Sequence, residues 1–136
     1  MTIVIDASVA LTWSFGDETT PETERLLDRV KADGAFAPAL WRLEVGNALL
    51  VARRRGRLTP EVLDGELRSI LALPVALDHE STGSAFSVVL DLATRHRLTI
   101  YDATYLELAR RLGLALATLD AALRTAALSE GVPLLP

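Results

Sequence analysis

Thr2-Ile3-Val4-Ile5-Asp6 opens the chain and decides its fold class. Four β-branched residues in succession predict a buried strand, and an acid follows it directly. A second apolar run, residues 116–119, also ends in an acid, Asp120. Short apolar strands of this kind are typical of parallel sheets that are covered on both faces. We therefore expect a parallel sheet whose carboxyl-terminal edge carries acidic side chains, where such sheets bind ligands.

The segments between these strands predict helices. Thr20-Pro21-Glu22 and Thr59-Pro60-Glu61 each place a hydroxyl cap, a proline and an acid at a helix start. The expected helices are 9–15, 21–33, 39–55, 60–72, 84–96, 101–112 and 121–130. The further expected strands are 35–37, 74–77 and 132–135, with a brief extended piece at 98–100. Strands that alternate with helices predict an α/β fold. No linker is visible in the 136 residues, so we expect one domain, 1–136.

Composition excludes several classes of protein. There are no cysteines and only two histidines, which excludes disulfides and thiol catalysis and makes a zinc site improbable. No stretch approaches the roughly 20 apolar residues of a membrane span, and residues 1–10 lack the basic start of a secretory signal. We therefore expect a cytoplasmic protein without a membrane segment. Eighteen acidic residues against 14 basic ones, a net charge of −4, disfavour binding of nucleic acid by bulk charge alone.

Four acids stand out because a helix start or a neighbouring arginine does not readily explain them. Asp6 and Asp120 follow strands, and Asp102 opens a helix at the same expected edge, although it could instead cap that helix. Glu44 lies in the apolar stripe of helix 39–55, although it could instead pair with an arginine.

Convergence of these four acids would require a cation. Two unit charges about 4 Å apart repel by about 4 kcal/mol at an effective dielectric near 20. Oxygen-only ligands without cysteine or histidine favour Mg²⁺ or Mn²⁺. Such a site predicts phosphoryl chemistry with a metal-activated water.

Neighbouring polar residues could complete the site. Asn47 lies one helical turn after Glu44, where it could orient a carboxylate or join two helices by a hydrogen bond. One dense basic cluster ends helix 39–55, and it could contact an RNA backbone, neutralise the helix C-terminus, or do both. This cluster consists of Arg53, Arg54, Arg55 and Arg57.

Four short segments of the sequence, taken in order, resemble PIN-domain ribonucleases, and most closely the VapC-type toxins of bacterial toxin–antitoxin pairs. They are Ile-Val-Ile-Asp-Ala-Ser-Val at 3–9, Glu-Val-Gly-Asn-Ala-Leu at 44–49, Leu-Thr-Ile-Tyr-Asp-Ala-Thr-Tyr-Leu-Glu-Leu-Ala at 98–109, and Leu-Ala-Thr-Leu-Asp at 116–120. Together they span nearly the whole chain. The resemblance implies a three-layer α/β/α sandwich that cuts RNA with Mg²⁺ or Mn²⁺, forms a homodimer and is inhibited by a cognate antitoxin.

The resemblance also implies roles for individual residues. The catalytic acids are Asp6, Glu44, Asp102 and Asp120, and the direct metal ligands among them are Asp6 and Asp102. Ser8 and Thr118 match hydroxyls that line the pocket, although each could serve only in capping or in a loop hydrogen bond. One departure from the family pattern concerns substrate binding at this edge. Family members often carry a basic residue soon after the fourth acid, whereas the first basic residue after Asp120 is Arg124.

Three rival functions are open to a chain of this composition. One is a PIN-like module that binds RNA or protein without cutting, which requires a defect in a site whose four acids are all present. A haloacid-dehalogenase-type phosphatase needs a second aspartate where this chain has Ser8. A receiver domain needs a lysine at a late strand end, and Lys31 is the only lysine. We therefore favour the ribonuclease.

Overall fold

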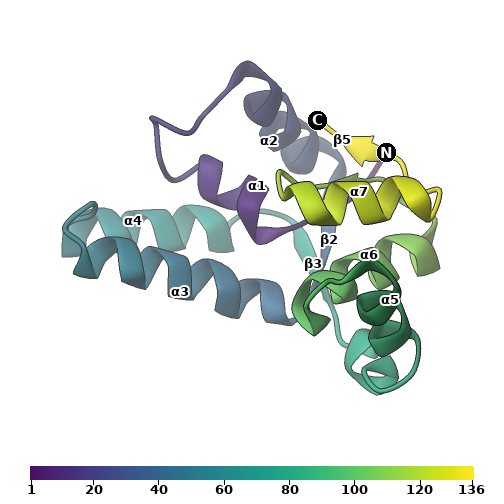
Figure 1. Cartoon of the computed structure of the whole chain (residues 1–136). Helices are drawn as coiled ribbons and strands as arrows, with labels where there is room; N and C mark the ends of the chain where they lie inside the picture. The colour runs from purple at the N-terminus through teal and green to yellow at the C-terminus, as the bar shows by residue number, and fades with distance from the viewer.

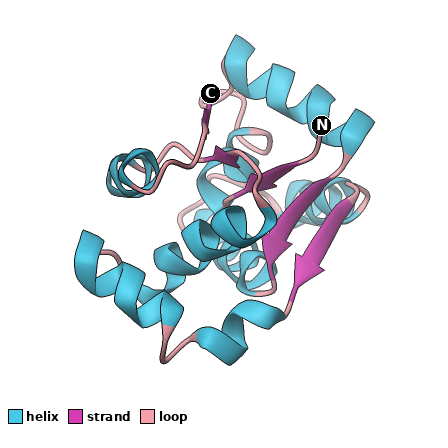
Figure 2. Cartoon of the chain, turned by 90° about the vertical axis from the view of Figure 1, so that its right-hand side faces the viewer, coloured by secondary structure: helices cyan, strands magenta, loops and turns pink.

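The computed structural model describes residues 1–136 and has a sheet of five parallel strands at its centre. The strands are β1 (Ile3–Ile5), β2 (Ala35–Pro38), β3 (Val75–Asp78), β4 (Leu116–Ala117) and β5 (Leu134–Leu135), in the order β3-β2-β1-β4-β5. Ile3 pairs with Ala35 and Val4 with Leu116, so β1 lies between β2 and β4. All three residues of β1 are fully buried, as the sequence predicts. Figure 2 shows the strands enclosed by helices.

Helices fill every connection between the strands. They are α1 (Ala7–Thr12), α2 (Pro21–Asp33), α3 (Leu40–Arg54), α4 (Pro60–Leu71), the short 3₁₀ helix η1 (Glu80–Ser84), α5 (Val88–His96), α6 (Ile100–Leu112) and α7 (Ala121–Ser129). Because parallel crossovers are right-handed, this strand order places α1–α4 on one face of the sheet and α5–α7 on the other. Figure 1 shows the two groups on opposite sides of the strands. The expected three-layer α/β/α sandwich is confirmed.

The two hydroxyl-proline signals mark helix starts as predicted. Thr20 accepts a hydrogen bond from the Thr23 amide at 3.2 Å, and Thr59 accepts one from the Val62 amide at 3.2 Å. Proline follows each cap at the first helical position. Helices α2 and α4 therefore begin where the sequence places them. None of the helices is both long and apolar enough to cross a bilayer.

Other expected boundaries are wrong, in part because capping side chains set them. The helix expected at 9–15 begins at Ala7, since Asp6 caps it. The brief extended piece expected at 98–100 ends at Thr99, which has extended backbone and caps α6 from Ile100 onward. The helix expected at 84–96 is split into η1 and α5, and the strand expected at 116–119 ends at Ala117. Asp102 is thus in the first turn of a helix and does not follow a strand.

A network of ion pairs fastens η1 and the end of β3 to α6. The Arg111 guanidinium donates to Glu107 at 2.7 Å, to Asp78 at 2.8 Å and to Glu80 at 3.1 Å. The hydroxyl of Ser81, itself buried, donates to Glu107 at 2.7 Å. Burial alone would raise the pKa of Asp78, but hydrogen bonds from Arg111 and Ser81 hold that pKa below its usual value. One arginine is therefore the shared counter-charge of three acids, of which Glu107 is buried and Glu80 is exposed.

Replacing Arg111 with methionine should lower the free energy of unfolding by about 3 kcal/mol, because it leaves buried carboxylates without a counter-charge. The native stabilisation through Asp78 is present above the usual carboxyl pKa of about 4 and is lost as the pH falls through the lowered value. Urea unfolding across this pH range measures both effects. Arg25→Met removes an exposed pair with Glu22 at 3.9 Å and should cost no more than about 1 kcal/mol. Equal losses in the two variants would contradict the expectation.

Candidate active site

Asp6 is the most buried of the four predicted acids, with 5% of its surface exposed. Its Oδ1 accepts hydrogen bonds from the Ser8 hydroxyl at 2.6 Å and from the Val9 amide at 3.1 Å, and its Oδ2 accepts one from the Thr118 hydroxyl. Burial raises the pKa of Asp6, these three hydrogen bonds oppose the rise, and the charge of Asp102 adds to it. Asp6 is therefore a carboxylate that the protein surrounds with neutral donors.

Ser8 and Thr118 tie the end of β1 to the end of β4. Besides donating to Asp6, the Ser8 hydroxyl accepts from the Leu119 amide at 2.9 Å. The Thr118 hydroxyl accepts from the Asp120 amide at 3.1 Å. Both hydroxyls thus contact the acidic pocket directly, and they make loop hydrogen bonds as well. The structure thus shows the loop hydrogen bonds of both residues, and their role in the pocket stays a prediction.

Glu44 approaches the pocket from α3, half-buried, and accepts a hydrogen bond from the Tyr105 hydroxyl. Burial raises the pKa of Glu44, the Tyr105 hydrogen bond lowers it, and the charges of Asp102 and Asp6 raise it further. No arginine pairs with Glu44, so that alternative is wrong. Tyr105 is a residue that sequence reasoning missed. Its position three residues after Asp102, on the buried face of α6, is the signal that could have indicated it.

Asp102 and Asp120 complete the group from two helix starts. Asp102 is the third residue of α6, and its amide donates to the Thr99 hydroxyl at 3.0 Å, so Thr99 and not Asp102 is the cap. Burial raises the pKa of Asp102, and so does the charge of Asp120. Asp120 is exposed and caps α7 by accepting from the Leu123 amide at 2.8 Å. Asp102 is the common member of the group, because its charge raises the pKa of Asp6 and of Glu44 and the charge of Asp120 raises its own.

This donor set fits a hard divalent cation. It contains only oxygen atoms, and no arginine or lysine forms an ion pair with any of the four acids. No group of three or more aspartate, glutamate or histidine side chains is arranged so that it could hold a metal ion. Mg²⁺ does not need three protein ligands, because it commonly takes one or two protein carboxylates and completes its octahedron with water and phosphate oxygens. Asp6 and Asp102, whose charges interact, stay the pair predicted to hold it.

Comparison with known proteins agrees with this arrangement. The family model described as PIN domain matches residues 3–128. The chain belongs to the PIN-domain family. Ribonuclease VapC3 of Pyrobaculum aerophilum is 30% identical over 120 residues, which are 88% of this chain and 90% of the relative. Ribonuclease VapC1 of Mycobacterium tuberculosis is 37% identical over 91 residues, 66% of this chain and 65% of the relative. These relatives identify the chain as a PIN domain of the VapC type.

Solved structures share the fold. PAE2754 from Pyrobaculum aerophilum superposes with a TM-score of 0.69 at 24% identity, covering 93% of this chain and 84% of the other. FitAcB from Neisseria gonorrhoeae superposes with a TM-score of 0.70 at 14% identity, covering 100% and 97%. At such identities the likeness concerns the fold alone, and it confirms the PIN-like α/β/α architecture.

The other predicted residues of this PIN domain have mixed outcomes. Asn47 is exposed and its side chain makes no hydrogen bond, so neither of its expected interactions is observed.

Arg57 is fastened to the protein, because it pairs with Asp17 at 3.1 Å and stacks over the Phe15 ring at 4.1 Å. The remaining members of its cluster are exposed and form no ion pair; they are Arg53, Arg54 and Arg55. Within this cluster, only these three have a guanidinium free of ion pairs.

Arg124, the first basic residue after the fourth acid, fastens the C-terminal end of the PIN domain. Its guanidinium donates to the carbonyl oxygens of Thr118 at 2.8 Å, Leu135 at 3.3 Å and Pro136 at 3.2 Å. These contacts hold β5 and the chain end against the turn that precedes Asp120. The departure from the family pattern noted in the sequence therefore places a structural arginine at this edge.

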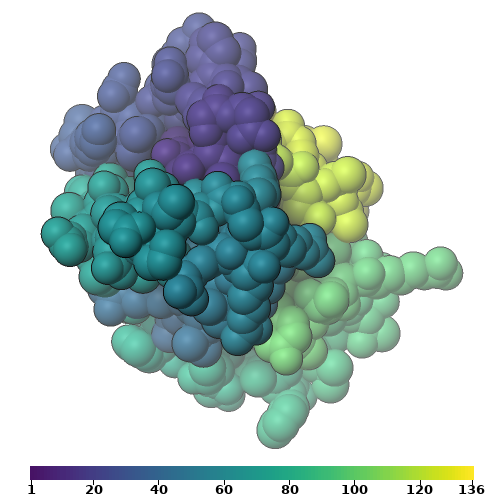
Figure 3. All heavy atoms as spheres, turned by 90° about the vertical axis from the view of Figure 1, so that its left-hand side faces the viewer, coloured from purple at the N-terminus to yellow at the C-terminus, as the bar shows by residue number.

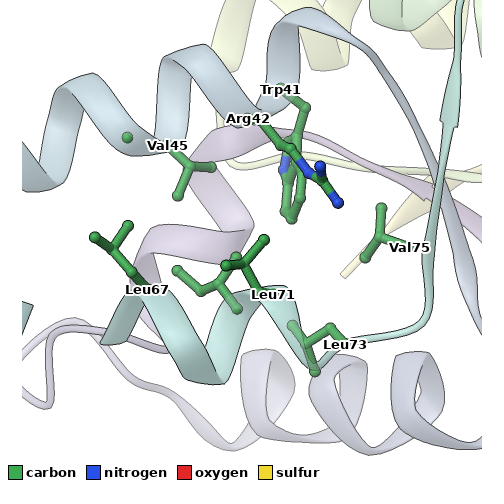
Figure 4. A pocket seen from close by; sticks show the side chains of 9 residues that line it. Trp41, Arg42, Val45, Leu67, Leu71, Leu73 and Val75 are labelled. Carbon is green, nitrogen blue, oxygen red and sulfur yellow. The ribbon is translucent and has the colours of Figure 1, made fainter. Parts of the chain in front are cut away.

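A groove in this PIN domain lies away from the acids, between α3 and α4 (Figure 4). It is mainly apolar, and its wall includes Trp41, Val45, Leu67, Leu71 and Leu73. The indole Nε1 of Trp41 is buried and has no hydrogen-bond partner. Figure 3 shows the face of the molecule on which the α3–α4 pair stands forward, beside the N-terminal segments. None of the predicted acids lines this groove.

Replacing Asp6 with asparagine should stabilise the metal-free protein at pH 7, by about 1 kcal/mol, as is common when a costly active-site charge is removed. Because the pKa of Asp6 is raised, its ionisation opposes folding, so the wild-type protein loses stability as the pH rises from about 4 through the raised value. Asparagine can still accept from Val9 and can donate to Thr118. Urea unfolding in the presence of a chelator measures the effect. Asp64→Asn on exposed α4 is the control, and a gain of the same size there would contradict the explanation.

Proposed function

We propose that this PIN domain is a Mg²⁺- or Mn²⁺-dependent endoribonuclease that acts as the toxin of a toxin–antitoxin pair in the cytoplasm. The observation that carries the proposal is the convergence of Asp6, Glu44, Asp102 and Asp120 without any basic partner. Relatives named ribonucleases support the choice of RNA as the substrate. A carboxylate group that lacks a counter-charge is suited to bind a cation and, through it, a phosphodiester.

Each acid has a distinct part in hydrolysis of the RNA phosphodiester bond. Asp6, oriented by Ser8 and Thr118, and Asp102, in the first turn of α6, would hold the metal. When bound, the metal lowers the pKa of water and stabilises the charge that develops at phosphorus.

The other two acids act on the attacking water. Glu44 has a raised pKa, which suits a carboxylate that must take a proton near neutral pH. Tyr105 fixes one of its oxygens. Asp120, exposed at the rim, orients the attacking water from the other side of the pocket.

The same proposal includes a cognate antitoxin and a homodimer. Protein partners need apolar surface to bind, and this chain exposes it in two ways. One is the groove between α3 and α4. The other is a set of exposed apolar side chains, with Leu43 at 76% and Phe86 at 94% exposure. We assign the antitoxin and the second copy of the chain to such surfaces.

Asp6→Asn and Asp102→Asn should each lower the rate of Mg²⁺- or Mn²⁺-dependent RNA cleavage by at least about 100-fold, because each removes a metal ligand worth several kcal/mol in the transition state. The measurement is cleavage of total cellular RNA by purified protein, with end mapping and with circular dichroism to confirm the fold. Asp64→Asn should cleave like the wild type. Unchanged cleavage by Asp6→Asn protein would refute the mechanism. Absence of cleavage by the wild type would favour a PIN-like binding module.

Expression of the chain alone should arrest bacterial growth, and expression of the Asp6→Asn variant should not. Co-expression of the small protein encoded beside it should relieve the arrest, because an antitoxin blocks the active toxin. Growth curves with the two genes under separate promoters measure both effects. Normal growth with active, soluble wild-type protein would refute the assignment as a toxin while leaving the nuclease untouched.

A further inference from the structure

Helix α5 ends on a residue with unusual backbone geometry. Its C-cap, Arg97, has φ 54° and ψ 40° in the left-handed region. Arg97 is the only non-glycine residue of the chain with a positive φ. The other positive-φ positions are all glycines at or just after helix ends; they are Gly34, Gly56, Gly113 and Gly131. A side chain costs free energy in this conformation that glycine does not, so its retention at this one helix end calls for a function of the side chain.

The guanidinium of Arg97 is free, unlike those of its neighbours. Arg95 and Arg110 pair with Glu130, and Arg111 pairs with three acids. Arg97 is exposed and forms neither an ion pair nor a side-chain hydrogen bond. A strained position thus presents an unpaired positive charge.

This charge stands at the entrance to the helix that carries Asp102. Arg97 is two residues before Thr99, whose hydroxyl accepts the Asp102 amide hydrogen. The α5–α6 junction is the short connection in Figure 1 that leads into the start of α6. A polyanion bound at the acids needs a cation nearby, and no arginine contacts the acids themselves.

An exposed aromatic ring lies in the same segment. Tyr101 is 63% exposed and directly precedes Asp102. It is four residues before Tyr105, so both rings share one face of α6, and Tyr105 donates from that face to Glu44. Tyr101 therefore stands beside the acidic pocket, one turn further out. Proteins that bind single-stranded RNA combine positive charge with aromatic rings on which bases stack.

We propose that Arg97 and Tyr101 position single-stranded RNA over the acids: the Arg97 guanidinium binds a backbone phosphate, and the Tyr101 ring stacks on an adjacent base. The inference rests on the proposed ribonuclease function and deepens it by naming the residues that hold the substrate. Both residues act in substrate binding, so their loss raises KM and leaves kcat largely unchanged.

Arg97→Gly separates binding from stability. Glycine fits φ 54°, so the melting temperature should rise or stay constant. KM for a short fluorescein-labelled single-stranded RNA should rise about tenfold, and the slope of log affinity against log salt should fall by about 0.7, the share of one phosphate contact. Arg68→Gln, which removes an exposed charge on α4, should leave both quantities unchanged. A raised melting temperature with unchanged KM and salt slope would overturn the assignment of Arg97.

Tyr101→Leu and Tyr101→Phe separate stacking from other roles. Leucine should raise KM about tenfold, as expected for one lost stacking contact, and phenylalanine should restore the wild-type value. When Tyr101→Leu is introduced into the Asp6→Asn protein, its affinity for the same RNA, measured by fluorescence anisotropy, should fall in parallel. Equal weakening on a fully paired duplex of the same sequence, or an unchanged KM with leucine, would overturn the assignment. Absence of cleavage by the wild-type protein would refute the proposed function. Cleavage by the wild type together with an unchanged KM in the Arg97 and Tyr101 variants would refute only this inference.

Discussion

Desolvation of Asp6 is the constraint on which the site depends. The residue follows the central strand directly, and its carboxyl is almost entirely withdrawn from solvent. The protein surrounds this carboxyl with hydroxyl and amide donors. It also places two further acids nearby, because the charge of Asp102 raises the pKa of Asp6 and the charge of Asp6 raises the pKa of Glu44. Neutral donors hold a carboxylate in place without cancelling its charge. The site therefore keeps its capacity for a cation.

The chain treats its other buried acids differently, which makes the contrast informative. Glu107 accepts a hydrogen bond from Arg111. Glu130 has three basic partners at hydrogen-bond or ion-pair distance, which are Arg95, Arg110 and His96. The four site acids have none. Without those four, acidic and basic residues balance at 14 each, so the net charge of −4 is equal to the charge of the site. Under the proposed function, RNA would therefore be bound through a metal and a few placed side chains, and not through a general basic surface.

Much of the fold could be predicted from local signals, while the pairings of the site could not. Thr59 before a proline fixes a helix start, and the β-branched run before Asp6 fixes the central strand, because both signals lie within a few residues. The bond between Tyr105 and Glu44 joins residues 61 positions apart, and no periodicity along the chain encodes it. The same holds for Arg57, whose cluster indicated RNA binding although the side chain pairs with Asp17. Helix periodicity gives the face of a residue but not its partner.

Helix capping and site assembly use the same side chains. Asp6 caps α1, Asp120 caps α7, and Thr99 caps α6 one turn before Asp102. Three helix starts therefore converge on the acids, and the positive end of each helix dipole, roughly half a charge, faces them. These partial charges reduce the repulsion among four carboxylates but fall well short of neutralising it. Most of the negative charge of the site is therefore left without compensation by the protein, and under the proposed function that charge would provide the free energy for binding a cation.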